Sequence, residues 1–114
     1  DDSKRLNPMS IVIIHCSCAA DGSADAIAKT LVEERLAACV QVLPGVRSFY
    51  GWNDEICVDD EVLMLIKTTS AEFEALKTRL LELHPYELPE LIAVDVSVAH
   101  ETYVDWVESR VGVP

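Results

Sequence analysis

The stretch Leu83-His84-Pro85-Tyr86-Glu87-Leu88-Pro89-Glu90-Leu91 lies where a helical pattern ends and an apolar strand pattern begins. Each proline fixes φ at about −65° and disfavours helical geometry for the residue before it. This predicts a short, stiff, extended link that carries an imidazole, a phenol and carboxylates. A segment that only joins two elements is more often built from Gly, Ser or Asn. We therefore interpret this link as functional, and the rest of the chain as the scaffold that positions it.

Helical spacing precedes the link, and strand alternation follows it. Thr69 and Glu72 have the spacing of a capping box, which predicts the start of a helix. Residues 91–98 place apolar side chains at every second position, which predicts a strand, and residues 101–110 predict a short terminal helix. The apolar sides of the two helices are predicted to be Phe73, Leu76, Leu80 and Leu83 in the first and Tyr103, Trp106 and Val107 in the second.

The N-terminal part begins with a strand and a helix. Residues 9–18 include a run that is apolar on both faces, as is typical of a central strand. Asp21-Gly22 turns the chain, and Ser23 is the predicted N-cap of an amphipathic helix that ends near Leu36.

Two further strands form a long hairpin. Residues 37–50 contain Pro44-Gly45, which predicts a bulge and an edge position. The tip is predicted at residues 52–55, which lack the tight Asn-Gly sequence. Residues 55–68 then form a third strand that is again apolar on both faces.

The predicted order is β-α-β-β-α-β with a final helix, which is the pattern of a ferredoxin-like α+β fold with strand order 4-1-3-2. Residues 9–114 are expected to form this domain, and the polar residues 1–8 a flexible tail. Because two strands are apolar on both faces, the second sheet face needs a cover. Hairpin arms of about 14 residues would reach roughly 45 Å, which favours a closed oligomer with exchanged hairpins.

Composition limits the classes of partner. The net charge is −11, from 9 basic and 20 acidic residues, which argues against nucleic-acid binding. An acidic surface is compatible with attraction of cations, although it also serves solubility alone. No apolar run reaches the ~18 residues of a membrane span, and residues 11–14 are too short a run for a signal peptide. We therefore predict a soluble protein.

Four cysteines occur in a chain that is large enough to fold without disulfides, so we expect free thiols. Cys16 and Cys18 are two residues apart on a strand and share one face. Together with the imidazole of His84, a thiolate at Cys16 suits copper or zinc. The alternative is a buried thiol and a structural histidine at a helix end, and Cys39 and Cys57 are expected to be small core or interface residues.

Enzyme signatures are absent from the sequence. It contains no glycine-rich phosphate loop, no Gly-x-Ser-x-Gly elbow and no CxxC pair. The first loop, residues 17–23, also lacks the arginine with which an acylphosphatase of the same fold would hold phosphate. We therefore expect a protein that is not an enzyme.

A series of motifs resembles the CutA family over residues 11–106, in order and at the right spacing. These motifs are Glu34-Arg35-Leu36-Ala37-Ala38-Cys39, Pro44-Gly45, Ser48-Phe49-Tyr50-Gly51-Trp52, Lys67-Thr68-Thr69, His84-Pro85-Tyr86-Glu87-Leu88-Pro89-Glu90 and Tyr103-Val104-Asp105-Trp106. The resemblance implies a ferredoxin-like homotrimer, similar in assembly to the PII signalling proteins. It also implies a cytoplasmic protein without an enzymatic reaction, linked to tolerance of divalent cations and of copper above all.

The resemblance implies two metal ligands and an inter-subunit cleft. Cys16 matches a family copper ligand near the end of the first strand, and His84 matches the second histidine of a ligand pair, whose first position is Leu83 here. The cleft residues would be Tyr50, Trp52, Glu61, Lys67, Tyr86, Glu87 and Glu90. They predict an alternative function, a PII-like sensor or scaffold that binds a small ligand or partner protein; a salt-bridged network at the trimer interface is the other interpretation.

Overall fold

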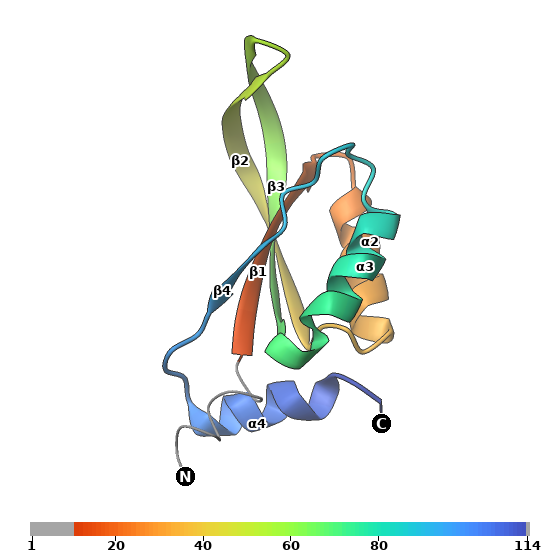
Figure 1. The fold of residues 1–114 in the computed structure, drawn as a ribbon, viewed down its shortest axis with the longest axis vertical. Coiled ribbons are helices and arrows are strands. Elements are labelled where there is room, and N and C mark those ends of the chain that lie inside the picture. Colours follow the sequence, from red (N-terminus) through yellow and green to blue (C-terminus); the bar gives the residue numbers. More distant parts are fainter. Residues whose placement is uncertain (1–10, 114) are drawn as a thin grey trace.

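A computed structural model describes residues 11–113. The elements are β1 (Ile11–Ala19), α2 (Ser23–Glu33), β2 (Cys39–Trp52), β3 (Glu55–Thr69), a 3-10 turn (Ser70–Glu72), α3 (Phe73–Leu83), β4 (Ile92–Asp95) and α4 (Glu101–Arg110). The four strands form one antiparallel sheet in the order β2-β3-β1-β4, and α2 and α3 lie side by side on one face (Figure 1). This confirms the ferredoxin-like α+β fold with a long β2–β3 hairpin and a C-terminal helix. The expected tail, residues 1–8, lies outside the described residues.

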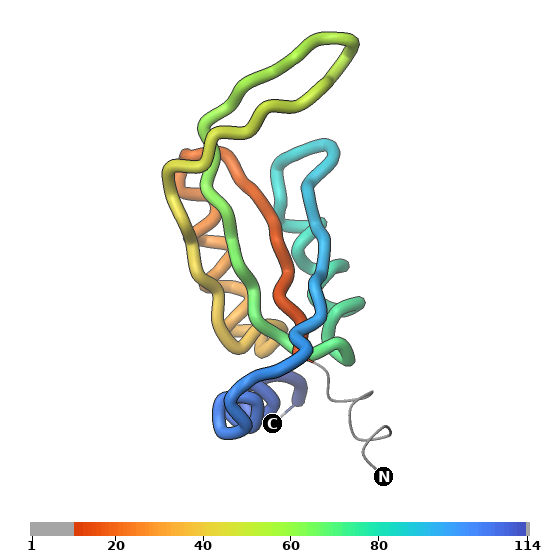
Figure 2. The backbone as a smooth tube through the Cα atoms, turned by 90° about the vertical axis from the view of Figure 1, so that its left-hand side faces the viewer, coloured from red at the N-terminus to blue at the C-terminus, as the bar shows by residue number. Residues whose placement is uncertain are grey.

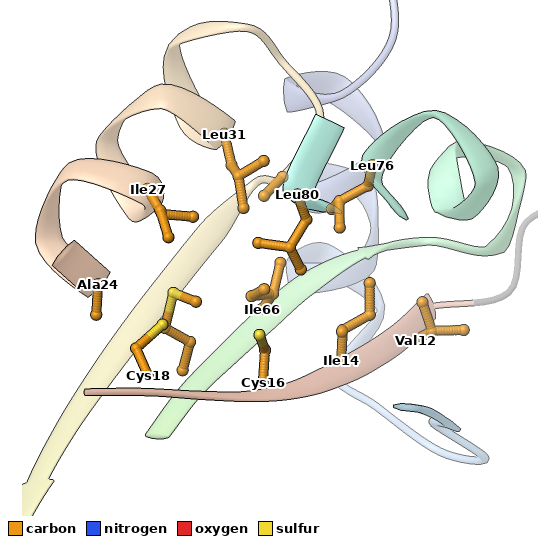
Figure 3. Close-up of a cluster of buried hydrophobic side chains, with 12 residues drawn as sticks. Val12, Ile14, Cys16, Cys18, Ala24, Ile27, Leu31, Ile66, Leu76 and Leu80 are labelled. Carbon is orange, nitrogen blue, oxygen red and sulfur yellow. The ribbon is translucent and has the colours of Figure 1, made fainter. Parts of the chain in front are cut away.

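The main core lies between β1, β3 and the two helices. Side chains alternate along β1, so that Val12, Ile14, Cys16 and Cys18 face the helices and are buried (Figure 3). Leu31, Leu76 and Leu80 close the layer from the helix side with no exposed surface. Burying one such side chain contributes ~1.5–3 kcal/mol, whereas an exposed ion pair contributes ~0.2–1 kcal/mol. The apolar layer therefore stabilises the fold far more than the surface ion pairs do.

The opposite face of the sheet is apolar as well. The strand register places Ile13, Leu63, Leu65, Ile92 and Val94 there, and Ile92 and Val94 are 54% and 50% exposed. β4 is shorter than the predicted residues 91–98, because regular pairing with β1 stops at Asp95. No helix in the described part of the chain is long and apolar enough to cross a membrane.

The hairpin extends beyond the sheet and gives the molecule extents of 51 × 27 × 23 Å (Figure 2). The predicted bulge is confirmed, because the β2–β3 register shifts between Leu43 and Val46 and Gly45 adopts φ 84°. The tip is tighter than predicted. Asn53 and Asp54 alone connect the arms, with φ of 52° and 62°, which is the left-handed geometry of a type I′ turn.

Both predicted helix starts are wrong in detail. Ser23 is the first residue of α2 rather than its cap, and its backbone N–H donates to the Asp21 carboxylate at 3.0 Å. Thr69 makes no side-chain capping bond, because it is buried and paired with Ile11 at the end of β3. A 3-10 turn follows Thr69, so that α3 begins only at Phe73.

Helix α4 lies across the end of the sheet, where Val107 packs with Ile11 and Ala38 (Figure 1). Arg35 ends the preceding helical region earlier than predicted, because it adopts φ 61°. Its guanidinium donates to the carbonyls of Gly112 at 2.7 Å and Ser109 at 3.1 Å. The α2–β2 connection is thus fastened to the C-terminal end of α4.

Candidate functional site

The link from α3 to β4 has the extended geometry that its prolines predict. His84 follows the last residue of α3 with φ −79° and ψ 133°, and its N–H donates to the Leu80 carbonyl at 2.9 Å. Pro85 forbids another helical residue at this point. The helix therefore ends with the imidazole of His84 turned into the protein, where the residue is only 7% exposed.

Both ring nitrogens of His84 have backbone partners. The N–H of Tyr86 donates to Nδ1 at 3.1 Å, so Nδ1 carries no proton. Nε2 therefore carries the proton of the neutral ring, and it donates to the Ser17 carbonyl at 2.8 Å. Ser17 lies beyond His15, the last residue of β1 that pairs with β4. The imidazole thus fastens the link to the open end of β1, which gives His84 a structural role.

The same ring lies beside two thiols. One donor atom each from Cys16, Cys18 and His84 lies within 4.8 Å of the other two, and all three residues are buried. The Cys18 sulfur is 3.5 Å from Nε2. We call these residues the thiol–imidazole cluster. The sequence led to Cys16 and His84 as the metal pair and did not select Cys18, although the shared strand face of the two cysteines was the available signal.

The two thiols of the cluster differ in acidity. A hydrogen bond to Cys18, together with burial, raises the pKa of Cys16 far above its ordinary value. The same hydrogen bond lowers the pKa of Cys18. Cys18 is therefore the thiol that gives up its proton first. Cys39 and Cys57 are half-buried and belong to the edge strand and the hairpin, away from this group.

The donor set suits a thiophilic ion. Two sulfurs and one imidazole nitrogen in a buried position match the preference of Cu(I) and Zn(II) for soft and borderline ligands. Carboxylate oxygens, which Mg(II) and Ca(II) prefer, are not part of the group. The position of the predicted first ligand is taken by Leu83, which packs against the core from α3.

Tyr86 connects the cluster to the opposite side of the sheet. Its ring contacts that of His84 edge-on, with centroids 4.7 Å apart. Its hydroxyl donates to Glu61 Oε2 at 2.6 Å. Burial, and next the bond to Glu61, raise the pKa of Tyr86 above its ordinary value. Glu61 itself is 6% exposed, so this phenol partners a buried carboxylate.

A cleft of about 900 Å³ lies between the hairpin arms and the link, which face each other in Figure 2. Six of the seven residues predicted for a cleft between subunits line this cleft within one chain: Tyr50, Trp52, Glu61, Tyr86, Glu87 and Glu90. A cleft between subunits stays a prediction. Lys67 is not among the lining residues; it lies toward the other end of β3 and donates to Gln41.

Sequence reasoning missed Asp59 as a lining residue. This carboxylate accepts from the Tyr50 hydroxyl, and that bond, ahead of burial, raises the pKa of Tyr50 to about 12. The signal was the strand period, since Asp59 lies two residues before Glu61 on β3.

Comparisons with known proteins agree with these features. Residues 12–110 match the family described as CutA1 divalent ion tolerance protein. A divalent-cation tolerance protein CutA from Thermus thermophilus is 48% identical over 86 residues, which are 75% of this chain and 84% of that protein. The crystal structure of CutA from Xylella fastidiosa has a TM-score of 0.87 at 44% identity, and the match covers 90% of this chain and 98% of that one. The structure of a CutA from Archaeoglobus fulgidus, described as periplasmic, has a TM-score of 0.86 at 29% identity, with 90% and 99% covered.

Proposed function

The chain belongs to the CutA1 divalent ion tolerance protein family, and we propose that it acts in metal tolerance by holding a thiophilic ion, copper above all, at the thiol–imidazole cluster. The observation that carries this proposal is the convergence of Cys16, Cys18 and His84 within 4.8 Å in a buried position. The family is not known for any enzymatic reaction, and the function we propose includes none.

The chemistry of binding follows from the hydrogen bonds of the thiol–imidazole cluster. A thiol must lose its proton to become a ligand, and Cys18 loses its proton first because its pKa is lowered. Nε2 can bind an ion only after its proton moves to Nδ1, so His84 has to give up both its bond to the Ser17 carbonyl and its bond from the Tyr86 N–H. Each lost bond costs ~0.5–1.5 kcal/mol, which is small beside the ~10–16 kcal/mol of zinc binding to thiol–imidazole sites in zinc-finger peptides. His84 can therefore bind an ion in exchange for its two fastening bonds.

A competition titration with a chromophoric Cu(I) chelator on reduced protein tests this proposal. Cys18→Ser and Cys16→Ser should each weaken Cu(I) binding by at least about 100-fold, because loss of a direct ligand exceeds the ~10–100-fold effect of losing an outer partner. Cys39→Ser is the matched control, since it removes a thiol outside the cluster. The site would be refuted if all three variants lost Cu(I) affinity equally. It would also be refuted if a variant with both Cys16→Ser and Cys18→Ser kept the wild-type affinity.

We further propose that three copies of the chain assemble as a PII-like homotrimer. The apolar second face of the sheet and the projecting hairpin support this, because both leave apolar surface uncovered in one chain. Sedimentation at micromolar concentration should give three times the mass of 12.6 kDa. A folded monomer under these conditions would contradict the proposal.

The compartment we propose is the cytoplasm. All four cysteines are free thiols, and thiols stay reduced there. Cell fractionation of the producing organism tests this, and recovery of the protein only from an exported fraction would refute it. The experiment is informative because the CutA from Archaeoglobus fulgidus is described as periplasmic, so compartments other than the cytoplasm occur among the relatives.

The cleft supports a second candidate function, that of a sensor or scaffold that binds a small ligand or a partner protein. The observation that favours it is the assembly of six predicted residues around one cavity, on the far side of Tyr86 from the thiol–imidazole cluster. A thermal-shift screen with metals and with small organic molecules separates the two functions, since only the second predicts shifts without metal.

A further inference from the structure

The ring of His84 fastens the link, residues 84–91, to β1. Nε2 donates to the Ser17 carbonyl at 2.8 Å, and Nδ1 accepts from the N–H of Tyr86 at 3.1 Å. Both bonds belong to one tautomer of the neutral ring, the one that carries its proton on Nε2. The fastening therefore lasts only while Nε2 keeps that proton.

A ligand role for His84 changes the bond to Tyr86 as well as the bond to Ser17. Nε2 is the ring nitrogen beside the thiols, with the Cys18 sulfur at 3.5 Å, whereas Nδ1 faces the backbone of the link itself. A neutral imidazole that offers Nε2 to an ion carries its proton on Nδ1. That proton would point at the N–H of Tyr86, and two donors that face each other form no hydrogen bond. The amide of Tyr86 therefore has to turn away from the ring whenever Nε2 is a ligand.

Tyr86 connects this change to the base of the hairpin. Its ring contacts that of His84 with centroids 4.7 Å apart, and its hydroxyl donates to Glu61 Oε2 at 2.6 Å. Glu61 lies on β3 opposite Ala19, the last residue of β1, and on its other side it pairs with Val46, the first paired residue beyond the bulge. A movement of Tyr86 therefore reaches the residue from which the hairpin projects.

The rest of the fold does not depend on the two ring bonds. β4 pairs with β1 from Ile92 to Asp95, beyond the link, and the last turn of α3 is closed by the backbone N–H of His84, which donates to the Leu80 carbonyl. The thiols of the cluster belong to the core between the sheet and the helices, so they are buried within one chain and lie away from the sheet face that the proposed trimer covers. The link can therefore change while the sheet, the helices and the trimer stay as they are.

We propose that the link is a metal-dependent switch, fastened to β1 while His84 keeps its two ring bonds and released, with Tyr86 turned away, when His84 serves as a ligand. The inference rests on the proposed metal-binding function and adds its conformational consequence, which is that the base of the hairpin responds to the metal state of the thiol–imidazole cluster. Coupling of this kind is reciprocal, so a contact that holds the link in its fastened state must weaken metal binding. The bond between Tyr86 and Glu61 is such a contact, and neither residue belongs to the cluster.

Nuclear magnetic resonance on the full chain, with nitrogen-15 in its histidines, tests the first step. Cu(I) is diamagnetic, and it is supplied without oxygen from a chelator that keeps weaker sites empty. The His84 ring should carry its proton on Nε2 before Cu(I) is added and on Nδ1 afterwards, and its signals are assigned by their absence in His84→Gln. His100, which precedes α4, is the internal control and should keep its tautomer.

Hydrogen exchange and Cu(I) affinity test the later steps. Exchange of the Tyr86 amide should become about tenfold faster with Cu(I), because its acceptor is lost, while the Val96 amide, which donates to the Ile11 carbonyl, should not change. Tyr86→Phe removes the bond to Glu61 and should tighten Cu(I) binding by about threefold to tenfold. Tyr50→Phe is the matched control, since it removes a phenol that donates to Asp59 on the hairpin, and it should leave the affinity unchanged.

The outcomes distinguish the switch from the function on which it rests. If Cu(I) does not bind at the thiol–imidazole cluster, the proposed function and the switch both fail. If Cu(I) binds there while His84 keeps its proton on Nε2 and the Tyr86 amide exchanges as before, the proposed function stands and the switch is overturned. Equal Cu(I) affinities of Tyr86→Phe, Tyr50→Phe and the unchanged chain would overturn the connection to Glu61.

Discussion

Replacing His84 in three ways separates its structural role from its role as a ligand. The imidazole makes two bonds to backbone groups, one as acceptor from Tyr86 and one as donor to Ser17. His84→Asn places an amide oxygen near the position of Nδ1 and keeps the acceptor. His84→Gln reaches to the position of Nε2 and keeps a donor. His84→Ala removes both bonds.

The bond count sets the expected destabilisation. One lost bond costs about 0.5–1.5 kcal/mol, and a buried carbonyl left without a donor costs about 1–3 kcal/mol. The acceptor-keeping Asn variant leaves the Ser17 carbonyl without its donor, so we expect a cost of about 1–3 kcal/mol. The donor-keeping Gln variant should cost about 1 kcal/mol, and the Ala variant about 2–4 kcal/mol because both losses combine.

Chemical denaturation at one fixed protein concentration, in EDTA, measures these costs, because assembly would otherwise make the midpoint depend on concentration. Cu(I) titration of the same proteins provides the second measurement, and all three variants should lose the imidazole ligand equally. Stability that falls by less than about 0.5 kcal/mol in His84→Ala would refute the fastening role. Stability that falls by the same amount in all three would show that the two bonds are not separable.

Three further predictions concern other parts of the chain. Arg35→Ala should lower the free energy of unfolding by about 2–3 kcal/mol, because it removes two charged hydrogen bonds to the end of α4. Arg35→Gly should lower it by about 1 kcal/mol less, because glycine adopts the left-handed φ freely. Equal losses in the two variants would contradict the argument from φ. Asp54→Gly should stabilise the hairpin by about 0.5–1 kcal/mol, since it relieves φ 62° in the tip; a lower denaturation midpoint would refute this. The pKa of Glu34 is lowered by its paired hydrogen bonds from Arg79 at 2.9 and 3.0 Å, so its stabilisation is present above the pKa of the unfolded state and is lost as the pH falls through the lower pKa of the folded state. In Arg79→Met, an NMR titration should show the Glu34 pKa rising toward its ordinary value, and an unchanged pKa would rule out this cause.

The sequence predicted the layout of the sheet well, because its signals are local and periodic. Apolar runs in β1 and β3 marked them as central strands, and Pro44-Gly45 marked the bulge at its observed position. The bounds of α4 also agree with the prediction. These features depend on the side-chain period and on two residues with restricted or permissive backbones, and both can be read without tertiary contacts.

The details that the sequence did not predict depend on contacts across the fold. Thr69 has a capping residue's chemistry, yet pairing with Ile11 holds it in the sheet. Arg35 ends α2 early, because its side chain meets the C-terminal end of α4, which is more than 70 residues away in the chain. Buried or charged contacts between distant parts of the chain therefore override local helix and capping propensity at these positions.

The candidate site was predicted in composition rather than in arrangement. The prolines located the link, and the strand period placed Cys16 and Cys18 on one face, but only the packing of α3 against β1 brings His84 to Cys18. Lys67 shares the strand face of Glu61, yet it lies at the other end of β3 and outside the cleft. Strand period gives a side chain its face, whereas position along the strand decides which site it reaches.

The hairpin beyond the bulge has a consequence for the kinetics of the protein. Residues 46–52 pair only with residues 55–61, and β1 ends opposite Glu61. A two-stranded ribbon alone is at best marginally stable in water. In the proposed trimer, the ribbon's amides would be protected by neighbouring subunits rather than by their own chain. Hydrogen exchange at these amides would then require subunits to separate, so its rate would measure how often they do. The amides of β1 would instead report the unfolding of the domain itself.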